Sequence, residues 1–329
     1  MANGQHYSGI GGQAVLEGIM MRNKNMIAVA CSHQNGEIEV EVEEHHGLLE
    51  GSIWTKIPFV RGVFAFLDAL ITGISALNFS SQVYGEDEEE EKSAPESEAQ
   101  ERQNKVLMAV TTAVSLVLAV LLFMVLPCVL AGMLRGFLRE ESVLSLLEGL
   151  IRLVIFLGYM IAISTVKDIR RLYQYHGAEH KCINCIERGK PLTVQYVLSS
   201  SRFHKRCGTS FLVLVMLVSI ILFFFVNVDS FLLRILTRIL LVPVIAGICY
   251  EILHLAGRSD SLLVRIISAP GLWLQRITTG EPDAHMVEVA IAAVEAVFDW
   301  RGYLADEFGY DLAQLDTITP EAKVYRRKA

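Results

Sequence analysis

The chain has 329 residues, of which 52% are hydrophobic, and its mean hydropathy is +0.41. This is too apolar for an ordinary soluble protein. The formal net charge of −7 arises in one segment, because residues 85–104 hold nine acidic and two basic residues and the rest of the chain sums to zero. With no strongly basic domain and no recognition motif, the sequence does not predict nucleic-acid binding.

The cysteines and the N-terminus argue against secretion. The chain has six scattered cysteines: Cys31, Cys128, Cys182, Cys185, Cys207 and Cys249. Two of them, Cys128 and Cys249, lie inside hydrophobic runs, which is unlike a secreted disulfide framework. The first 20 residues contain no basic region followed by an apolar core, so we expect no cleavable signal peptide.

Residues 1–52 predict a small N-terminal β region. Three apolar or alternating runs, QAVLEGIMMR, MIAVACSH and EIEVEVEEH, are separated by the turn-forming stretches 23–25 and 34–36. The second stretch, Gln-Asn-Gly, is typical of a tight hairpin. We therefore expect an antiparallel sheet over residues 13–45, with Gly9, Gly11 and Gly12 as an irregular entry.

Residues 53–84 and 85–104 form two further segments. Within the first, Ile57 to Phe79 is a helical run with Arg61 and Asp68 seven residues apart on one face. This pattern favours an interfacial or re-entrant amphipathic helix, and a full membrane span is the alternative. The acidic segment 85–104 has too little apolar mass to fold, so we expect a disordered linker.

Four transmembrane helices are predicted within residues 105–257. The four apolar runs are Val106–Leu134, Val143–Val166, Thr209–Val228 and Phe231–Gly257. Glu148 and Arg152 in the second run are four residues apart and can pair on one face. After these runs, residues 258–329 predict a helical region, with a soluble amphipathic helix over Met286–Asp299.

Charge orients the predicted spans. Residues 167–208 carry nine Lys or Arg against three acidic residues, whereas the loops at the other ends of the spans, 135–142 and 227–230, carry two Lys or Arg between them. Basic loops remain in the cytoplasm. We therefore expect residues 167–208, the C-terminal region and both termini in the cytoplasm.

Residues 167–208 also contain the main candidate for chemistry, since three of the nine histidines and three of the six cysteines fall there. If the second transmembrane helix continues past the membrane through Tyr173 to Glu187, with Gly189 as its stop, His176 and His180 share one face. The string His-Gly-Ala-Glu-His matches H-x-x-E-H, in which two histidines bind zinc and the glutamate activates water. A third ligand is required, and His204, Cys207 or Glu251 could supply it.

Two other interpretations of the same loop stay open. Cys182, Cys185, His204 and Cys207 have the spacing of a structural Cys₃His zinc site, which would hold the loop together. Alternatively, the histidines are interfacial and the cysteines are small buried residues, with no metal at all. Glu251 and His254, three residues apart near the end of the fourth span, either bind something inside the bundle or form a pair stabilised by Arg258.

Four strings carry a resemblance to a known family. They are GGQAVLEGIMMR (11–22), YHGAEHKCINCIERG (175–189), SSRFHKRCGTSF (200–211) and EILHLAGR (251–258). In these the chain resembles the YqhQ-like family of bacterial membrane proteins of unknown function, described by prediction as metal-dependent enzymes. The resemblance implies a multi-pass protein of the bacterial plasma membrane. The family pattern lacks a cysteine at position 182, which favours His176, His180, His204 and Cys207 as the ligand set.

The sequence thus predicts a mainly α membrane protein with about four transmembrane helices, an interfacial or re-entrant helix, a small N-terminal antiparallel β region and a cytoplasmic C-terminal helical tail. The leading hypothesis for function is metal-dependent hydrolysis at the cytoplasmic face. Glu179 is the predicted catalytic base, the predicted cofactor is a divalent metal, zinc by its ligands, and the partners are membrane lipids. The alternative is a non-enzymatic scaffold or assembly factor for other membrane proteins, with a structural zinc site.

Overall fold

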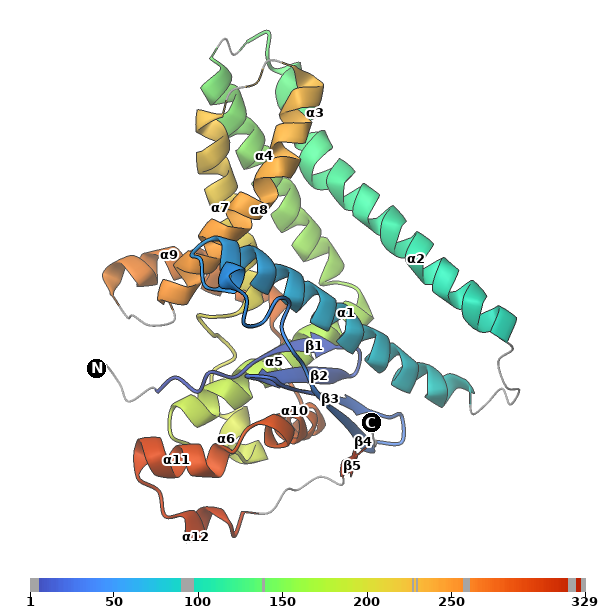
Figure 1. Ribbon diagram of the computed structural model, residues 1–329, viewed down its shortest axis with the longest axis vertical. Coiled ribbons are helices and arrows are strands. Elements are labelled where there is room, and N and C mark those ends of the chain that lie inside the picture. The colour runs from blue at the N-terminus through green and yellow to red at the C-terminus, as the bar shows by residue number, and fades with distance from the viewer. Residues whose placement is uncertain are drawn as a thin grey trace.

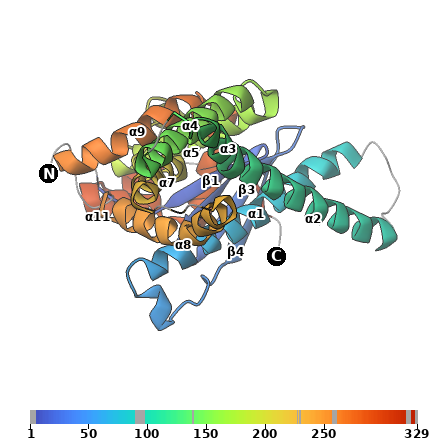
Figure 2. The same ribbon diagram turned by 90° about the horizontal axis from the view of Figure 1, so that it is seen from above.

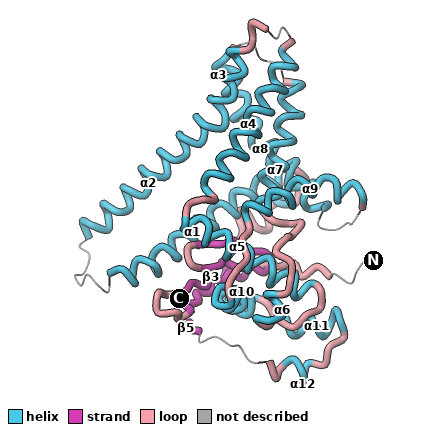
Figure 3. The backbone as a smooth tube through the Cα atoms, turned by 180° about the vertical axis from the view of Figure 1, so that it is seen from behind, coloured by secondary structure: helices cyan, strands magenta, loops and turns pink. Residues whose placement is uncertain are grey.

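The computed structural model describes residues 6–89, 98–137, 140–226, 228, 230–256, 261–318 and 324–326. A bundle of long helices stands on a mixed domain of strands and shorter helices (Figure 1). Most of the chain is helical, and the strands gather at one end of the molecule (Figure 3). These features confirm the predicted class, a mainly α membrane protein with a small sheet.

The bundle is built from the four predicted spans. Its helices are α2 (Glu98–Val120), which continues through a π-helical segment (Leu121–Val125) into α3 (Leu126–Met133), then α4 (Glu141–Ile163), α7 (Gly208–Phe225) and α8 (Phe231–Ala256). Inside the bundle Arg152 donates to Glu148 at 3.0 Å, as the spacing predicted, and to the Phe123 carbonyl at 2.8 Å. Arg238 of α8 also pairs with Glu148. One buried carboxylate of α4 therefore lies against two buried guanidinium groups, one from α4 and one from α8.

The sheet contains the predicted antiparallel region and one more strand. Its order is β1 (Gly11–Val15), β2 (Gly18–Asn23), β3 (Met26–Ser32), β4 (Ile38–Glu44) and β5 (Val324–Arg326). The first four strands are antiparallel, and β5 pairs in parallel with β4. The run QAVLEGIMMR is two strands and not one, because Glu17 adopts φ 46° in a tight turn. Because the run QAVLEGIMMR is almost continuously apolar, its sequence did not indicate this turn.

Both faces of the sheet are covered, so it is not a separate domain. On one face, side chains of β1, β2 and β3 pack against Ala76, Phe79 and Val83 of α1 (Val60–Glu89). On the other face the sheet shares a core with α5 (Lys167–Glu187) and α10 (Ala284–Val297). We call the sheet with α5 and α10 the sheet domain. It is assembled from three segments that are far apart in the sequence.

The C-terminal region is helical, as predicted. It consists of α9 (Leu262–Thr278), α10, α11 (Trp300–Phe308) and α12 (Leu312–Leu315), and the short elements upstream are a 3₁₀ turn (Ile53–Thr55) and α6 (Val194–Leu198). The helix α10 differs from the expected soluble amphipathic helix, since nine of its residues are buried. One face of α10 lies against the sheet. The spacing of its apolar residues predicted that buried face, but it could not show that the opposite face is covered as well.

Five of the described helices are long and apolar enough to cross a membrane, and α1 is one of them. It lies across the base of the bundle, between the bundle and the sheet (Figures 1 and 2). The expected disordered linker 85–104 lies partly outside the described residues. Its described parts are helical, because α1 extends to Glu89 and α2 begins at Glu98.

Candidate metal centre

The helix α5 carries the two histidines of the H-x-x-E-H string. It begins after a break, since Val166 has an extended backbone with ψ 131°, and is therefore a separate helix and not a continuation of α4. Asp168 lies in its first turn, where a negative charge is favoured. It ends at Glu187, and Gly189 with φ 70° provides the predicted stop. His176 and His180 lie one turn apart, with ring centroids separated by 4.3 Å.

Cys207 meets these two histidines from the next long helix. One ligand atom each of His176, His180 and Cys207 lies within 4.8 Å of the others, and this is the one such group of three or more among the residues that the structure describes. The Nε2 atom of His176 is 3.0 Å from Cys207 Sγ. Cys207 is the N-cap of α7, where its sulfur accepts a hydrogen bond from the Thr209 amide at 3.4 Å.

The backbone fixes the orientation of both imidazole rings. His176 Nδ1 lies 2.9 Å from the Thr278 carbonyl and His180 Nδ1 lies 2.6 Å from the Arg202 carbonyl. A carbonyl oxygen only accepts, so each Nδ1 carries the hydrogen and each Nε2 of the neutral ring has its lone pair available. His180 Nε2 is buried and has no hydrogen-bond partner in the described chain. Metal-binding histidines commonly use this arrangement.

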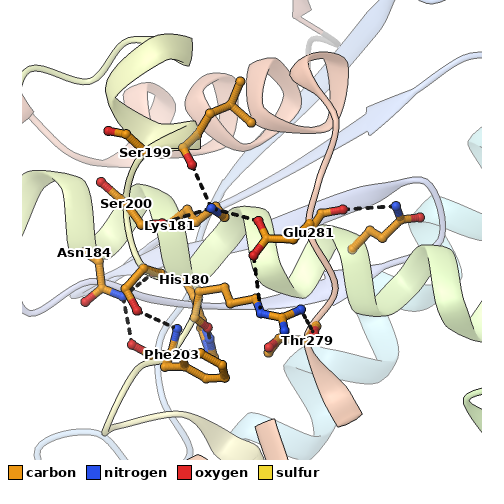
Figure 4. Close-up of polar contacts among 12 residues, drawn as sticks. His180, Lys181, Asn184, Ser199, Ser200, Phe203, Thr279 and Glu281 are labelled. Atoms are coloured by element: carbon orange, nitrogen blue, oxygen red, sulfur yellow. Dashed lines mark hydrogen bonds and ion pairs between the residues drawn. The ribbon is translucent and has the colours of Figure 1, made fainter. Parts of the chain in front are cut away.

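The loop that delivers Cys207 is tied to α5 by polar side chains (Figure 4). Lys181 Nζ donates to the Leu198 and Ser200 carbonyls at 2.8 and 2.9 Å. Asn184 Nδ2 donates to the Ser201 and Phe203 carbonyls at 2.7 and 3.0 Å. Lys181 and Asn184 of α5 thus hold the main chain of the loop, which explains a close approach of Cys207 that the sequence spacing could not show.

Glu179 lies between the histidines and the sheet. Its carboxylate is 3.9 Å from His176 Nε2, and its side chain is 6% exposed. Burial raises the pKa of Glu179 above its usual value, while His176 and a hydrogen bond from the Gly12 amide oppose that rise. A buried carboxylate with a raised pKa beside the His₂Cys cluster is suited to accept and return a proton.

His204 lies beside the cluster but faces another group. Its ring centroid is 5.6 Å from that of His180, and its Nε2 is 3.7 Å from Glu187 and 3.2 Å from Arg206. Burial, with the nearby Arg206 and His180 charges, lowers the pKa of His204 to about 4. His204 is therefore neutral at pH 7.

Glu187 anchors this second group. Burial alone would raise its pKa, but the hydrogen bond from His204 and the charges of Arg206 and His204 lower it to about 2. The Ser8 amide and hydroxyl also donate to it, at 3.1 and 2.9 Å. Glu187 thus fixes the N-terminal segment and Arg206 beside the cluster.

A cavity of about 900 Å³ opens onto these residues. Its walls come from β1, β2, α1, α5 and the start of α7, and include His176, Glu179, His204 and Cys207. The cavity lies where the bundle meets the sheet, so a bound molecule would contact both. This is the size and composition of a small-molecule or peptide site.

The remaining predicted site residues lie elsewhere. Glu251 accepts from Arg61 at 2.7 and 2.6 Å and from the Phe59 amide at 3.2 Å, so the structure does not bring it to the cluster. His254 stacks near Tyr250 on the same helix, with ring centroids 6.1 Å apart. Cys182 and Cys185 are buried in the core shared with the sheet. Cys185 is directed to the Lys190 and Pro191 carbonyls, and a Cys₃His site would need both sulfurs to move.

Sequence reasoning missed Gly12 and the two carbonyls that orient the histidines. A Cβ at Gly12 would lie 3.1 Å from Glu179 Cγ, so the glycine permits the contact between β1 and α5. Its place in a Gly-rich segment was the available signal. The Thr278 and Arg202 carbonyls give no signal in the sequence, because any residue type presents a carbonyl.

The fold and the cluster define a multi-pass membrane protein with a His₂Cys group at the junction of its bundle and its sheet domain. The chain belongs to the family described as "Protein of unknown function (DUF1385)", which it matches over residues 57–300. It is 37% identical over 292 residues to "Uncharacterized protein YqhQ" of Bacillus subtilis (strain 168), covering 85% of this chain and 89% of that protein. These findings confirm the YqhQ-like resemblance. No solved structure matches the chain.

Proposed function

We propose that the protein is a metal-dependent hydrolase that acts on a membrane-associated substrate at the cytoplasmic face. The observation that carries the proposal is the convergence of two imidazoles with available Nε2 lone pairs on the Cys207 sulfur. Both rings are held by backbone carbonyls. Nitrogen and thiolate ligands suit zinc, and three protein ligands leave a coordination position free for chemistry.

In this proposal each residue has a separate role. A divalent ion bound there would polarise the substrate and make water more acidic. His176, His180 and Cys207 are the ligands, with the positive end of the α7 dipole favouring an anionic sulfur at the N-cap. Glu179 receives the proton of the attacking water and returns it to the leaving group. His204 and Glu187 hold Arg206 at the cavity wall.

The ligand roles can be tested by the zinc content of detergent-purified protein. We expect about one zinc per chain in the wild type, and loss of zinc in the double variant His176→Ala with His180→Ala, because one protein ligand does not form a stable site. Cys182→Ala is the matched control, since this cysteine lies on the same helix but in the sheet-domain core. It should retain zinc.

Glu179→Gln separates hydrolysis from a scaffold. The amide preserves the shape of the side chain, so zinc and the fold should be retained, while complementation of a deletion strain should be lost. Mass spectrometry of membranes from the two strains would identify the species that only wild-type protein removes. Full complementation by Glu179→Gln would favour the scaffold alternative, and a wild-type protein without zinc would contradict both hypotheses.

A further inference from the structure

Among the described strands, none pairs with the outer edge of β1, and the residues of that strand line the cavity. The sheet order begins with β1, while β5 covers the opposite edge beside β4. Six consecutive residues, Gly9 to Ala14, line the cavity together with His176, Glu179 and Cys207. The main chain of an edge strand therefore lies beside the proposed metal ligands.

The outward direction of the backbone groups follows from one contact. The Gly12 amide donates to Glu179, so it points away from β2. Because successive residues of a strand alternate, the Ala14 amide points the same way, as do the carbonyls of these two residues. Within the described ranges, β1 has no backbone hydrogen bond to a segment other than β2. The Gly12 amide is held by Glu179, so the outer edge offers the Gly12 and Ala14 carbonyls and, between them, the Ala14 amide.

The residue types of β1 leave this edge uncovered. Natural proteins protect a free edge with a charge, a proline or a bulge, yet the β1 sequence GGQAV contains neither a charge nor a proline. Gly11 and Gly12 have no side chain that could shield the main chain, and nothing lies within 4 Å of a Cβ built on Gly11. Glycine in a strand commonly permits another backbone to approach.

We propose that the substrate is an extended polypeptide segment that binds as an added strand on the outer edge of β1. This proposal rests on the proposed function and names its substrate class. Two carbonyls with an amide between them, at strand spacing, match another extended main chain, whereas a lipid or a sugar has no such repeat. The edge lines the same cavity as the start of α7, at the base of the bundle, so we take the segment to be part of a membrane-anchored polypeptide.

Such a strand would place one of its peptide bonds beside Glu179. Water adds its oxygen to the carbonyl carbon of that bond and gives a proton to the Glu179 carboxylate. The C–N bond then breaks, and Glu179 returns the proton to the departing nitrogen. The products are a carboxylic acid and an amine, so one water molecule is consumed and no oxidant or reductant is needed.

The test compares probes that share a chelating group. Zinc-loaded protein in detergent is titrated with acetohydroxamate, with a fluorescein-labelled five-residue Val/Thr peptide hydroxamate, and with the same peptide N-methylated at alternate amides along one edge. We expect the unmethylated peptide hydroxamate to bind at least about tenfold more tightly than its methylated form, the effect of one or two backbone hydrogen bonds. Acetohydroxamate reports on the metal alone.

A substitution in β1 provides the complementary arm. Ala14→Pro removes the outward amide hydrogen but leaves the bonds to β2, and an edge strand accepts proline there. It should lower peptide hydroxamate affinity about tenfold and leave acetohydroxamate binding unchanged. Ala14→Ser, which keeps the amide hydrogen, is the matched control and should bind like the wild type. If Ala14→Pro does not fold, the comparison of methylated and unmethylated peptide hydroxamates on wild-type protein still tests the added-strand proposal.

The two proposals fail in different ways. Equal affinities for methylated and unmethylated peptides would overturn the added-strand proposal, even if zinc and acetohydroxamate bind as expected. Absence of zinc or of acetohydroxamate binding would overturn the proposed function. In that case the affinities of the peptides without the hydroxamate are measured, with and without N-methylation. Their difference decides whether the β1 edge binds an extended chain.

Discussion

At the residue scale, Lys181 connects the segments that form the His₂Cys cluster. It follows His180 directly, its side chain is 5% exposed, and it bonds to two carbonyls of the loop that precedes His204. It also pairs with Glu281 at 3.0 Å, in the segment that follows Thr278 and Thr279. One buried ammonium therefore joins α5 to the loop before Cys207 and to the segment whose carbonyl orients His176 (Figure 4).

Lys181→Met should weaken both the fold and the metal centre. Methionine fills a similar volume but leaves the Leu198 and Ser200 carbonyls without this donor, at a cost of about 1–3 kcal/mol for each buried group. We expect a lower thermal unfolding temperature and weaker zinc binding, because Cys207 loses its positioning. Lys167→Met, at the exposed start of the same helix, should change neither. An unchanged zinc affinity in Lys181→Met would contradict this role.

The sequence predicted the helical part of the site better than the rest. His176, Glu179 and His180 lie on one helix, so a period of 3.6 residues sufficed to bring them together. Cys207 was in the predicted set and lies with them. His204 and Glu251 were predicted on residue type alone. In the structure His204 lies with Glu187 and Arg206, and Glu251 pairs with Arg61. These partners come from segments that meet only in the folded chain. Residue type alone does not select between such partners.

At the element scale, the packing of α1 bears on whether it crosses the membrane. Its second half covers the sheet through Ala76, Phe79 and Val83. Its first half contacts the end of α8, where a Cβ built on Gly62 would lie 2.7 Å from Tyr250 Cβ. The same end of α8 leads into α9, which is tied to His204 through Gln275. Both halves of α1 therefore lie at the level of the sheet domain, as an interfacial helix requires.

Single-cysteine labelling at the two ends of α1 should give the same result. Cysteines placed at the exposed positions Lys56 and Tyr84 should both react with a membrane-impermeant maleimide only after permeabilisation. The six native cysteines are buried, so the wild type supplies the background. A spanning helix would instead expose one of these positions to reagent outside intact cells, and that result would contradict the interfacial assignment.

The elements that the sequence missed have two causes. The apolar parts of the four spans follow from local composition, whereas α5 was expected as a continuation of the second span and is a separate helix. The pairing of β5 with β4 and the burial of α10 on both sides depend on contacts between distant segments, while the local turn at Glu17 was hidden by the continuous apolar run around it. A strand of three residues carries almost no signal of its own. Its partner, Ile38–Val40, had to be in place first.

At the scale of the whole molecule, the connections place the sheet domain on one side of the bundle. The end of α4 leads directly into α5, α7 begins at the cluster, and the chain after α8 returns through α9 to α10. The end of α3, the start of α4, the end of α7 and the start of α8 lie at the far end of the bundle, away from the sheet (Figure 1). If the four bundle helices each cross the membrane, the chain returns to the side on which it began, and we expect α1 on that side.

The basic residues indicate which side that is. Nine Lys or Arg lie in residues 167–208, on the sheet-domain side. Positive residues remain in the cytoplasm, so the metal centre and the β1 edge should face a reducing compartment in which Cys207 stays a thiol or a metal ligand. A cysteine at Gly136, exposed at the far end, should react with an impermeant maleimide in intact cells, and one at Asn35 in the β3–β4 turn only after permeabilisation. The reverse pattern would place the proposed hydrolase outside the cell, and its substrate with it.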